Sequence, residues 1–174
     1  AEDPMSDRMR YYLGREYLFK GEWQKCVETL SSYLAMPGAT WNEERCAAMR
    51  WIAKSCLSLG RHGDAYAWYY RAIAEAPHMR DPFVEFARMC HALGDWPMAL
   101  YLAEEALNIA VKSATYVNMG YAWDHTPDDL SAIAAYHMGL PDRAIRHAEA
   151  ALAFAPEDER LKKNLEIVRA MRGA

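Results

Sequence analysis

Three basic residues, Arg15, Lys54 and Arg88, are the part of this 174-residue chain best suited to binding a charged ligand. A row of guanidinium and ammonium groups holds a carboxylate or a phosphate through charge-assisted hydrogen bonds. Lys54 and Arg88 are 34 residues apart, while Arg15 and Lys54 are 39 apart. The three residues act together only if the chain repeats a structural element that places them at equivalent positions.

Motifs for catalysis or metal binding do not occur in the sequence. Its four cysteines are separated by 20, 10 and 34 residues, unlike the two-residue spacing of zinc sites and redox pairs, and they are Cys26, Cys46, Cys56 and Cys90. There is no phosphate-binding loop, no His-Glu-x-x-His helix, no nucleophile elbow and no Asp-x-Asp metal pair. We therefore expect a chain that is not an enzyme and that has no catalytic residues, no bound metal and no cofactor.

Composition and charge narrow the class of partner. The 20 Lys and Arg residues against 24 Asp and Glu give a formal net charge of −4, whereas nucleic-acid binding needs an excess of cations. No apolar run approaches the roughly 18 residues of a membrane span, and no signal peptide opens the chain. Free cysteine behaves as a small buried apolar residue. We expect four reduced thiols, a cytoplasmic location, and neither nucleic-acid binding nor membrane insertion.

Small residues recur with the 34-residue period that separates Lys54 from Arg88. The same separation holds for Gly60 and Gly94, Ala53 and Ala87, Ala65 and Ala99, and Ala72 and Ala106. Small side chains at these positions let two helices approach closely. A glycine after an apolar helix suits its C-terminal cap, and this pattern occurs at Gly21, Gly60, Gly94 and Gly139.

This pattern resembles the tetratricopeptide repeat (TPR) family. One unit contains Ile52-Ala53, Cys56, Ala65, Tyr69, Ala72 and Pro77, and the next contains Phe83, Phe86-Ala87, Cys90, Gly94, Ala99 and Ala106. The resemblance implies an all-α, right-handed TPR solenoid of four helix-turn-helix repeats plus a C-terminal capping helix. The expected repeats span about 7–40, 46–79, 80–113 and 125–158, with a cap helix at 157–172. Residues 1–6 are expected to be a tag remnant or disordered.

Two insertions interrupt the period, at 37–41 and 113–123, and both contain aromatic residues: Trp41, Tyr116, Tyr121 and Trp123. Insertions in repeat arrays lie at one edge of the solenoid, where such rings can anchor a partner. The alternative, which we favour, is that the rings fold back and fill the junctions that the insertions widen. Nearby, Asp81-Pro82 is expected to cap the helix that it begins.

The TPR resemblance implies that the first helix of each repeat lines a concave groove. Counting repeat positions gives a groove set with five cations and two anions: Arg8, Tyr11, Arg15, Phe19, Arg50, Lys54, Asp81, Val84, Arg88, His91, Asp129, Ile133, Tyr136 and His137. A locally basic surface in an acidic chain favours an anionic partner. The residues expected to contact it are Arg8, Tyr11, Arg15, Arg50, Lys54, Arg88, His91 and Tyr136. In the alternative, part of the ladder forms internal ion pairs with Glu16, Glu44 and Glu85.

Longer stretches are similar to the TPR region that follows the catalytic domain in bacterial family-two glycosyltransferases. These stretches are MRYYLGREYLF (9–19), ATWNEERCAAMRWIA (39–53), AIAEAPHMRDPFVEFA (72–87) and DLSAIAAYHMGLPDRAIRHAEAAL (129–152). The metal-binding Asp-x-Asp motif of the transferase half is not present, so the resemblance implies an accessory module.

The leading hypothesis is a non-catalytic scaffold that binds a protein or peptide, with an acidic partner favoured by the basic groove. The alternatives are a sugar-modifying enzyme domain and a co-chaperone-like clamp for acidic peptide termini.

Overall fold

The computed structural model describes residues 6–171 of the chain. Within this range the chain forms nine α-helices and one 3-10 helix, and it contains no β-strand. The chain divides into two compact units, Ala1–Pro77 and His78–Ala174. The predicted all-α class is confirmed, and the division falls inside the stretch 7–174 that the sequence predicts to be one domain.

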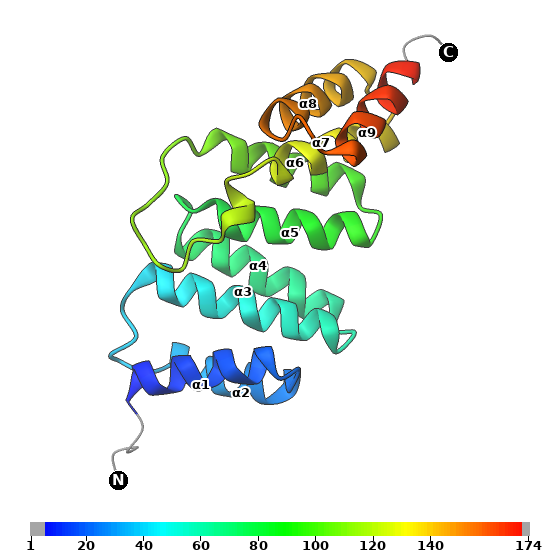
Figure 1. The fold of residues 1–174 in the computed structure, drawn as a ribbon. Helices are drawn as coiled ribbons and strands as arrows, with labels where there is room; N and C mark the ends of the chain where they lie inside the picture. The colour runs from blue at the N-terminus through cyan, green and yellow to red at the C-terminus, as the bar shows by residue number, and fades with distance from the viewer. Residues whose placement is uncertain (1–5, 172–174) are drawn as a thin grey trace. The chain divides into compact units, whose positions relative to one another are not determined.

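The first unit consists of two helical hairpins, drawn in blue and cyan in Figure 1: α1 (Asp7–Phe19) with α2 (Trp23–Leu34), and α3 (Asn42–Ser58) with α4 (His62–Glu75). Helix α2 packs against α3 and joins the hairpins. The core of the first unit includes the fully buried residues Tyr11, Leu30 and Ile52. A Cβ atom at Gly14 would lie 2.3 Å from Cδ2 of Leu30, so α1 and α2 approach closely only because residue 14 is glycine.

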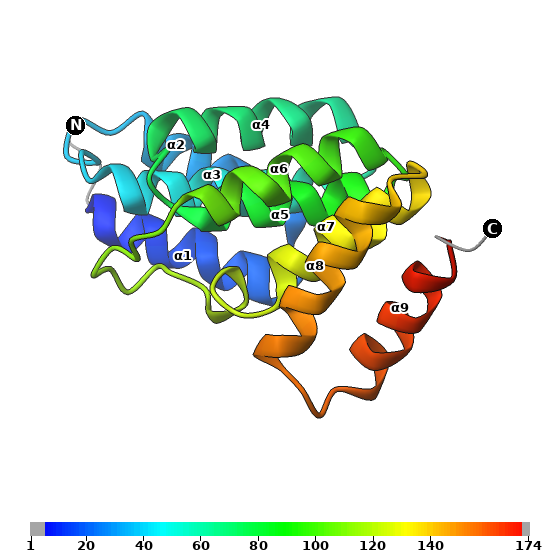
Figure 2. The ribbon, with the colours of Figure 1, turned by 90° about the horizontal axis from the view of Figure 1, so that it is seen from above.

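The second unit contains α5 (Arg80–Ala92), α6 (Trp96–Asn108), the 3-10 helix η1 (Gly120–Ala122), α7 (Thr126–His137), α8 (Pro141–Phe154) and α9 (Glu159–Ala170). Consecutive α-helices pack against one another, so that α6 contacts α7 and α8 contacts α9. The segment between α6 and α7 runs as a long connection interrupted by η1, and it is drawn in yellow-green in Figure 2.

The four predicted glycine caps are present in the structure. Positive φ angles of 69–74°, which an L side chain rarely adopts, occur at Gly21, Gly60, Gly94 and Gly139. Each follows the first helix of a hairpin and ends it in a left-handed turn.

Several helix boundaries differ from those expected. Helix α3 begins at Asn42, four residues before the predicted start of the second repeat at 46. Ser6 caps α1, because its Oγ accepts a hydrogen bond from the amide of Met9 at 3.2 Å, so Ser6 is ordered as part of the first helical hairpin. The capping helix α9 occupies Glu159–Ala170 of the expected 157–172. Residues 1–5 and 172–174, to which parts of these predictions refer, lie outside the described range.

The four cysteines are free and buried, as predicted. Burial raises the pKa of the Cys26 thiol, against an opposing hydrogen bond with Ser55, and burial also raises the pKa of Cys56. These thiols are therefore protonated core residues near neutral pH. None of the helices in the described part of the chain is both long enough and apolar enough to span a bilayer.

Candidate functional site

On α1, two predicted contact residues combine with exposed aromatic rings. The guanidinium of Arg15 lies 4.9 Å from the ring centre of Tyr12 and 5.8 Å from that of Phe19. The guanidinium of Arg8 lies 5.8 Å from the ring centre of Tyr12. Phe19 is 71% exposed, so the row forms part of the surface of the first unit. Arg15 also lies 3.6 Å from the carboxylate of Glu16, as the internal ion-pair alternative expected.

Two other predicted contact residues of the first unit are buried instead. Tyr11 has no exposed surface, because its ring packs against Tyr33 and Trp51 at centroid distances of 5.4 and 5.1 Å. Arg50 is 1% exposed. Neither side chain reaches solvent, so both are removed from the set of contact residues. Lys54, one turn further along α3, is exposed.

Arg88 of the second unit interacts with the connection between α6 and α7. Its guanidinium lies 4.2 Å from the ring centre of Tyr121, and its Nη2 lies 3.5 Å from Oγ1 of Thr126. The hydroxyl of Tyr121 donates a hydrogen bond to the carboxylate of Glu85, one turn before Arg88 on α5. Arg88 remains exposed while its flat face covers the ring, so its N–H edge still faces solvent.

The rest of this connection also lies against α5. The amide of Met119 donates a 2.6 Å hydrogen bond to Oδ1 of Asp81, whose side chain is fully buried. Arg80 lies 4.1 Å from the ring centre of Trp123 and donates to the carbonyl of Ile109 at 2.8 Å. The prediction that Asp81 caps its own helix is wrong, because α5 begins at Arg80 with Met79 at the N-cap and no side-chain cap hydrogen bond.

The four aromatic residues of the insertions do not form one exposed patch. Tyr121 and Trp123 are partly buried against α5, in agreement with the fold-back alternative. Tyr116 and Trp41 remain exposed, at 52% and 38%. Of the four rings predicted to anchor a partner, Tyr116 and Trp41 therefore remain candidates.

An aromatic row connects α5, α6 and α7 in the second unit. Trp96 stacks on His137 with a centroid distance of 3.9 Å and an interplanar angle of 8°. His91 and Tyr136 extend the row, with the ring of His91 5.2 Å from Trp96 and the ring of Tyr136 5.4 Å from His137. Burial lowers the pKa of His91, helped by the charge of His137 and opposed by Asp129. His91 is therefore a neutral ring at neutral pH.

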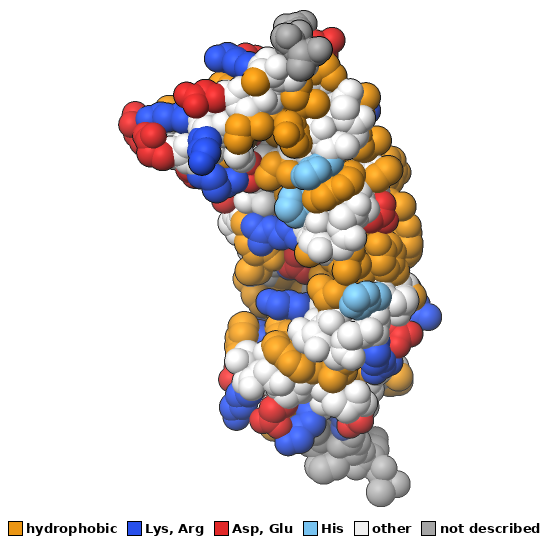
Figure 3. Space-filling model, turned by 90° about the vertical axis from the view of Figure 1, so that its right-hand side faces the viewer, with side chains coloured by type: hydrophobic (Ala, Val, Ile, Leu, Met, Phe, Trp, Pro, Cys, Tyr) orange, Lys and Arg blue, Asp and Glu red, His pale blue; other side chains and the backbone are white. Residues whose placement is uncertain are grey.

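Next to this row, α7 and α9 enclose a pocket of about 230 Å³. Its walls are mainly apolar, with a phenol, an imidazole and an amide at the side, and consist of Ala132, Ile133, Tyr136, His137, Asn164, Ile167 and Val168. A cavity of about 150 Å³ accommodates benzene, so this pocket is large enough for one aromatic or long aliphatic side chain. In the upper part of Figure 3, histidine side chains lie among hydrophobic ones, with basic side chains beside them.

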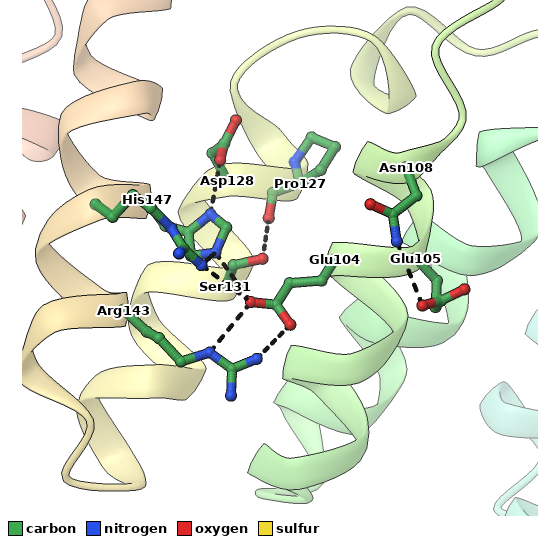
Figure 4. Close-up of polar contacts among 9 residues, drawn as sticks. Glu104, Glu105, Asn108, Pro127, Asp128, Ser131, Arg143 and His147 are labelled. Carbon is green, nitrogen blue, oxygen red and sulfur yellow. Dashed lines mark hydrogen bonds and ion pairs between the residues drawn. The ribbon is translucent and has the colours of Figure 1, made fainter.

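A partly buried polar cluster connects α7 to its neighbours (Figure 4). His147 of α8 contacts Asp128 of α7 through Nδ1 at 2.8 Å and Glu104 of α6 through Nε2 at 3.1 Å. Arg143 binds both oxygens of Glu104, with Nε 3.3 Å from Oε1. Burial tends to raise the pKa of Glu104, but hydrogen bonds and charges from Arg143 and His147 outweigh it and lower the pKa below its usual value. The cluster therefore holds in place the helix that presents Tyr136 and His137.

Within residues 6–171, no three His, Cys, Asp or Glu side chains come close enough together to hold a metal ion. The polar groups that line the α7–α9 pocket are the phenol of Tyr136, the imidazole of His137 and the amide of Asn164.

The structure is similar to solved TPR structures. The MamA protein superposes with a TM-score of 0.75 at 12% identity, covering 96% of this chain and 82% of MamA. A thermophilic TPR protein of Thermus thermophilus gives a TM-score of 0.62 at 16% identity, covering 97% of this chain and 84% of that one. The TPR-like repeats of a putative kinesin light chain from Podosopora anserina give 0.60 at 19% identity, covering 99% and 97%. No protein-family model and no curated protein matches the sequence.

At such low sequence identities, the structural similarity establishes the fold alone, and this fold is a TPR solenoid. In a solenoid of this kind each repeat packs only against its neighbours.

Proposed function

We propose that this chain binds a partner protein through an extended or helical peptide segment, with the α7–α9 pocket as the main anchor point in the second unit. The observation that supports the proposal best is the pocket of about 230 Å³ beside exposed Tyr136 and His137. Interfaces are dominated by a few anchors that fill such pockets. The anchor expected here is an aromatic or long aliphatic side chain.

Exposed positive charge indicates which residues the partner carries next to the anchor. Arg88 is exposed on α5 of the second unit, while the whole chain is acidic. An acidic segment is attracted by such local positive charge, and stacked guanidinium groups retain N–H edges for carboxylates. We therefore propose acidic residues next to the apolar anchor, and a protein partner rather than a nucleic acid.

A display library of random peptides, selected against the whole chain, tests this proposal. The expected binders carry an aromatic or aliphatic residue beside acidic residues, and their affinity falls as salt rises because screening shortens the reach of surface charge. Replacing Arg88 by Glu weakens binding several-fold, whereas Arg71→Glu on α4 is the matched charge control. Binders without acidic residues, or equal losses in both variants, would remove Arg88 from the site.

Arg146 is unsuitable as that control. Its Nη2 lies 3.6 Å from the carboxylate of Glu104 and 3.3 Å from Nε2 of His147, so reversing its charge would disturb the cluster that holds α7. Arg71 instead lies over the ring of Trp68, at 4.6 Å, in the first unit.

The narrower alternatives stay hypotheses. An accessory role beside a family-two glycosyltransferase rests on the sequence resemblance, and incubation with nucleotide sugars and a divalent metal is expected to give no turnover. A clamp for acidic termini predicts that a selected peptide loses its affinity when its C-terminal carboxylate is amidated. The anchor-pocket proposal predicts that amidation has little effect.

A further inference from the structure

A second pocket, of about 220 Å³, lies in the first unit where the 37–41 insertion meets the ends of three helices. Its walls include Asp7 and Arg8 from the start of α1, Tyr33 from α2, Trp41 from the insertion and Glu44 from α3. The proposed anchor pocket is in the other unit and shares no residue with this one.

Two carboxylates of this pocket differ from ordinary surface acids. Glu44 is 7% exposed and accepts a 2.8 Å hydrogen bond from the hydroxyl of Tyr33, which is itself buried. The carboxylate of Asp7 lies against the insertion, since a Cβ atom at Gly38 would be 2.9 Å from its Oδ2. A side chain at position 38 would therefore push Asp7 away from the pocket wall.

The pocket is electronegative. Burial raises the pKa of Tyr33, and the hydrogen bond and charge of Glu44 and the charge of Asp7 raise it further, against an opposing effect of Arg45. The hydroxyl of Tyr33 therefore stays protonated and donates to Glu44. Two carboxylates and the guanidinium of Arg8 give the described lining a formal charge of −2 + 1 = −1.

An aromatic ring completes the arrangement. Trp41 is 38% exposed at the pocket wall, so its indole is accessible from solvent. An indole face attracts a cation through its quadrupole, and the attraction grows when the cation is partly desolvated. Carboxylates beside an aromatic face are therefore complementary to an alkylammonium or a guanidinium group, and not to an anion.

We propose that this pocket binds a basic side chain, arginine or lysine, of a partner protein. The cationic group enters between Asp7, Glu44 and the ring of Trp41, where it forms charge-assisted hydrogen bonds with the carboxylates. Arginine fits best, because its planar fork bridges a carboxylate and stacks on an indole at the same time. This site is independent of the acidic-partner site proposed above, and it takes a ligand of opposite charge.

The test uses the whole chain and two tripeptide probes that differ in charge alone: acetyl-Gly-Arg-Gly-amide and its counterpart with citrulline in place of arginine. Titration followed by amide chemical shifts is expected to give at least about fivefold tighter binding of the arginine probe. The amides that shift are expected to be those of residues 38–44. Equal binding of the two probes, no shift with arginine, or shifts elsewhere would overturn the proposal.

Substitutions at the pocket wall test whether the arginine probe binds in this pocket. Asp7→Asn and Trp41→Ala are each expected to weaken binding of the arginine probe by about threefold or more. Glu43→Gln removes the same charge from the neighbouring position of the first turn of α3, does not line the pocket, and is expected to leave binding unchanged within error. Equal losses in Asp7→Asn and Glu43→Gln would show general charge attraction and overturn the pocket. Asp7 and Trp41 are chosen because neither is fully buried, so these variants are expected to fold.

Discussion

The two insertions that interrupt the repeat period use their aromatic residues in different ways. In the second, the ring centres of Tyr121 and Trp123 lie 4.2 and 4.1 Å from a guanidinium group of α5. In the first, Trp41 stays 38% exposed at the edge of an acidic pocket. An aromatic ring in a repeat insertion therefore stabilises the fold where a neighbouring helix supplies its cation. Where the wall supplies carboxylates instead, we propose that the ring helps to bind a cation from a partner.

The largest expected difference between the insertions concerns their tryptophans. Trp123→Ala is expected to lower the free energy of unfolding by about 2–3 kcal/mol, because it removes a partly buried ring and its contact with Arg80. Trp41→Ala, the matched control, is expected to change it by about 0.5 kcal/mol or less. Urea denaturation of the whole chain measures both. Similar losses in the two variants would show that the first insertion is also part of the core.

A smaller effect is expected where the second insertion is fastened to α5. Asp81→Asn keeps an acceptor for the amide of Met119 but removes the charge that strengthens this bond, which costs about 1–2 kcal/mol. Hydrogen exchange of the Met119 amide is expected to accelerate more than that of amides in α1. Unchanged exchange at Met119 would mean that the carboxylate does not hold the insertion.

The second insertion leads into α7, whose position depends on the cluster around Glu104. Glu104→Gln is expected to cost about 1 kcal/mol at pH 7, because an uncharged amide replaces the carboxylate that Arg143 and His147 contact. The pKa of Glu104 in the folded chain lies below the ordinary 4.5, so its contribution is complete above about pH 4.5 and is lost as the pH falls through the folded value.

Unfolding curves of wild type and Glu104→Gln at several pH values measure this contribution. The two proteins are expected to converge in stability below pH 4.5. A difference that stays constant down to strongly acidic pH would contradict the assignment of the charge to Glu104.

Much of the fold was predictable because repeated packing needs small residues at fixed intervals. The 34-residue period of Gly60 and Gly94 predicted helices that end in left-handed turns, and both glycines have positive φ. Boundaries at the insertions were less predictable. Helix α3 starts at Asn42, between the predicted insertion at 37–41 and the predicted start of the second repeat at 46, because nothing in the period fixes where a helix begins after an insertion.

The sites were predictable only in part. Counting repeat positions identified the exposed residues Lys54, Arg88 and Tyr136, but it assigned Tyr11 and Arg50 to the surface although both are buried. Position along a helix gives the direction of a side chain and not its depth below neighbouring rings. Trp96 was missed because it begins a second helix, and its stacking on His137 depends on the contact between α6 and α7. A tryptophan directly after Gly94-Asp95 was the available signal.

Calorimetric titration of a library-selected peptide into wild type, Tyr136→Ala and Tyr101→Ala tests the central claim most directly. Tyr136 lines the α7–α9 pocket, whereas Tyr101 is an exposed tyrosine on α6 outside it. Loss of an anchor contact is expected to weaken binding about tenfold or more in Tyr136→Ala. Wild-type affinity in Tyr101→Ala, together with that loss, is the result that the account predicts. Equal affinity in all three proteins would contradict the claim that the α7–α9 pocket binds the partner.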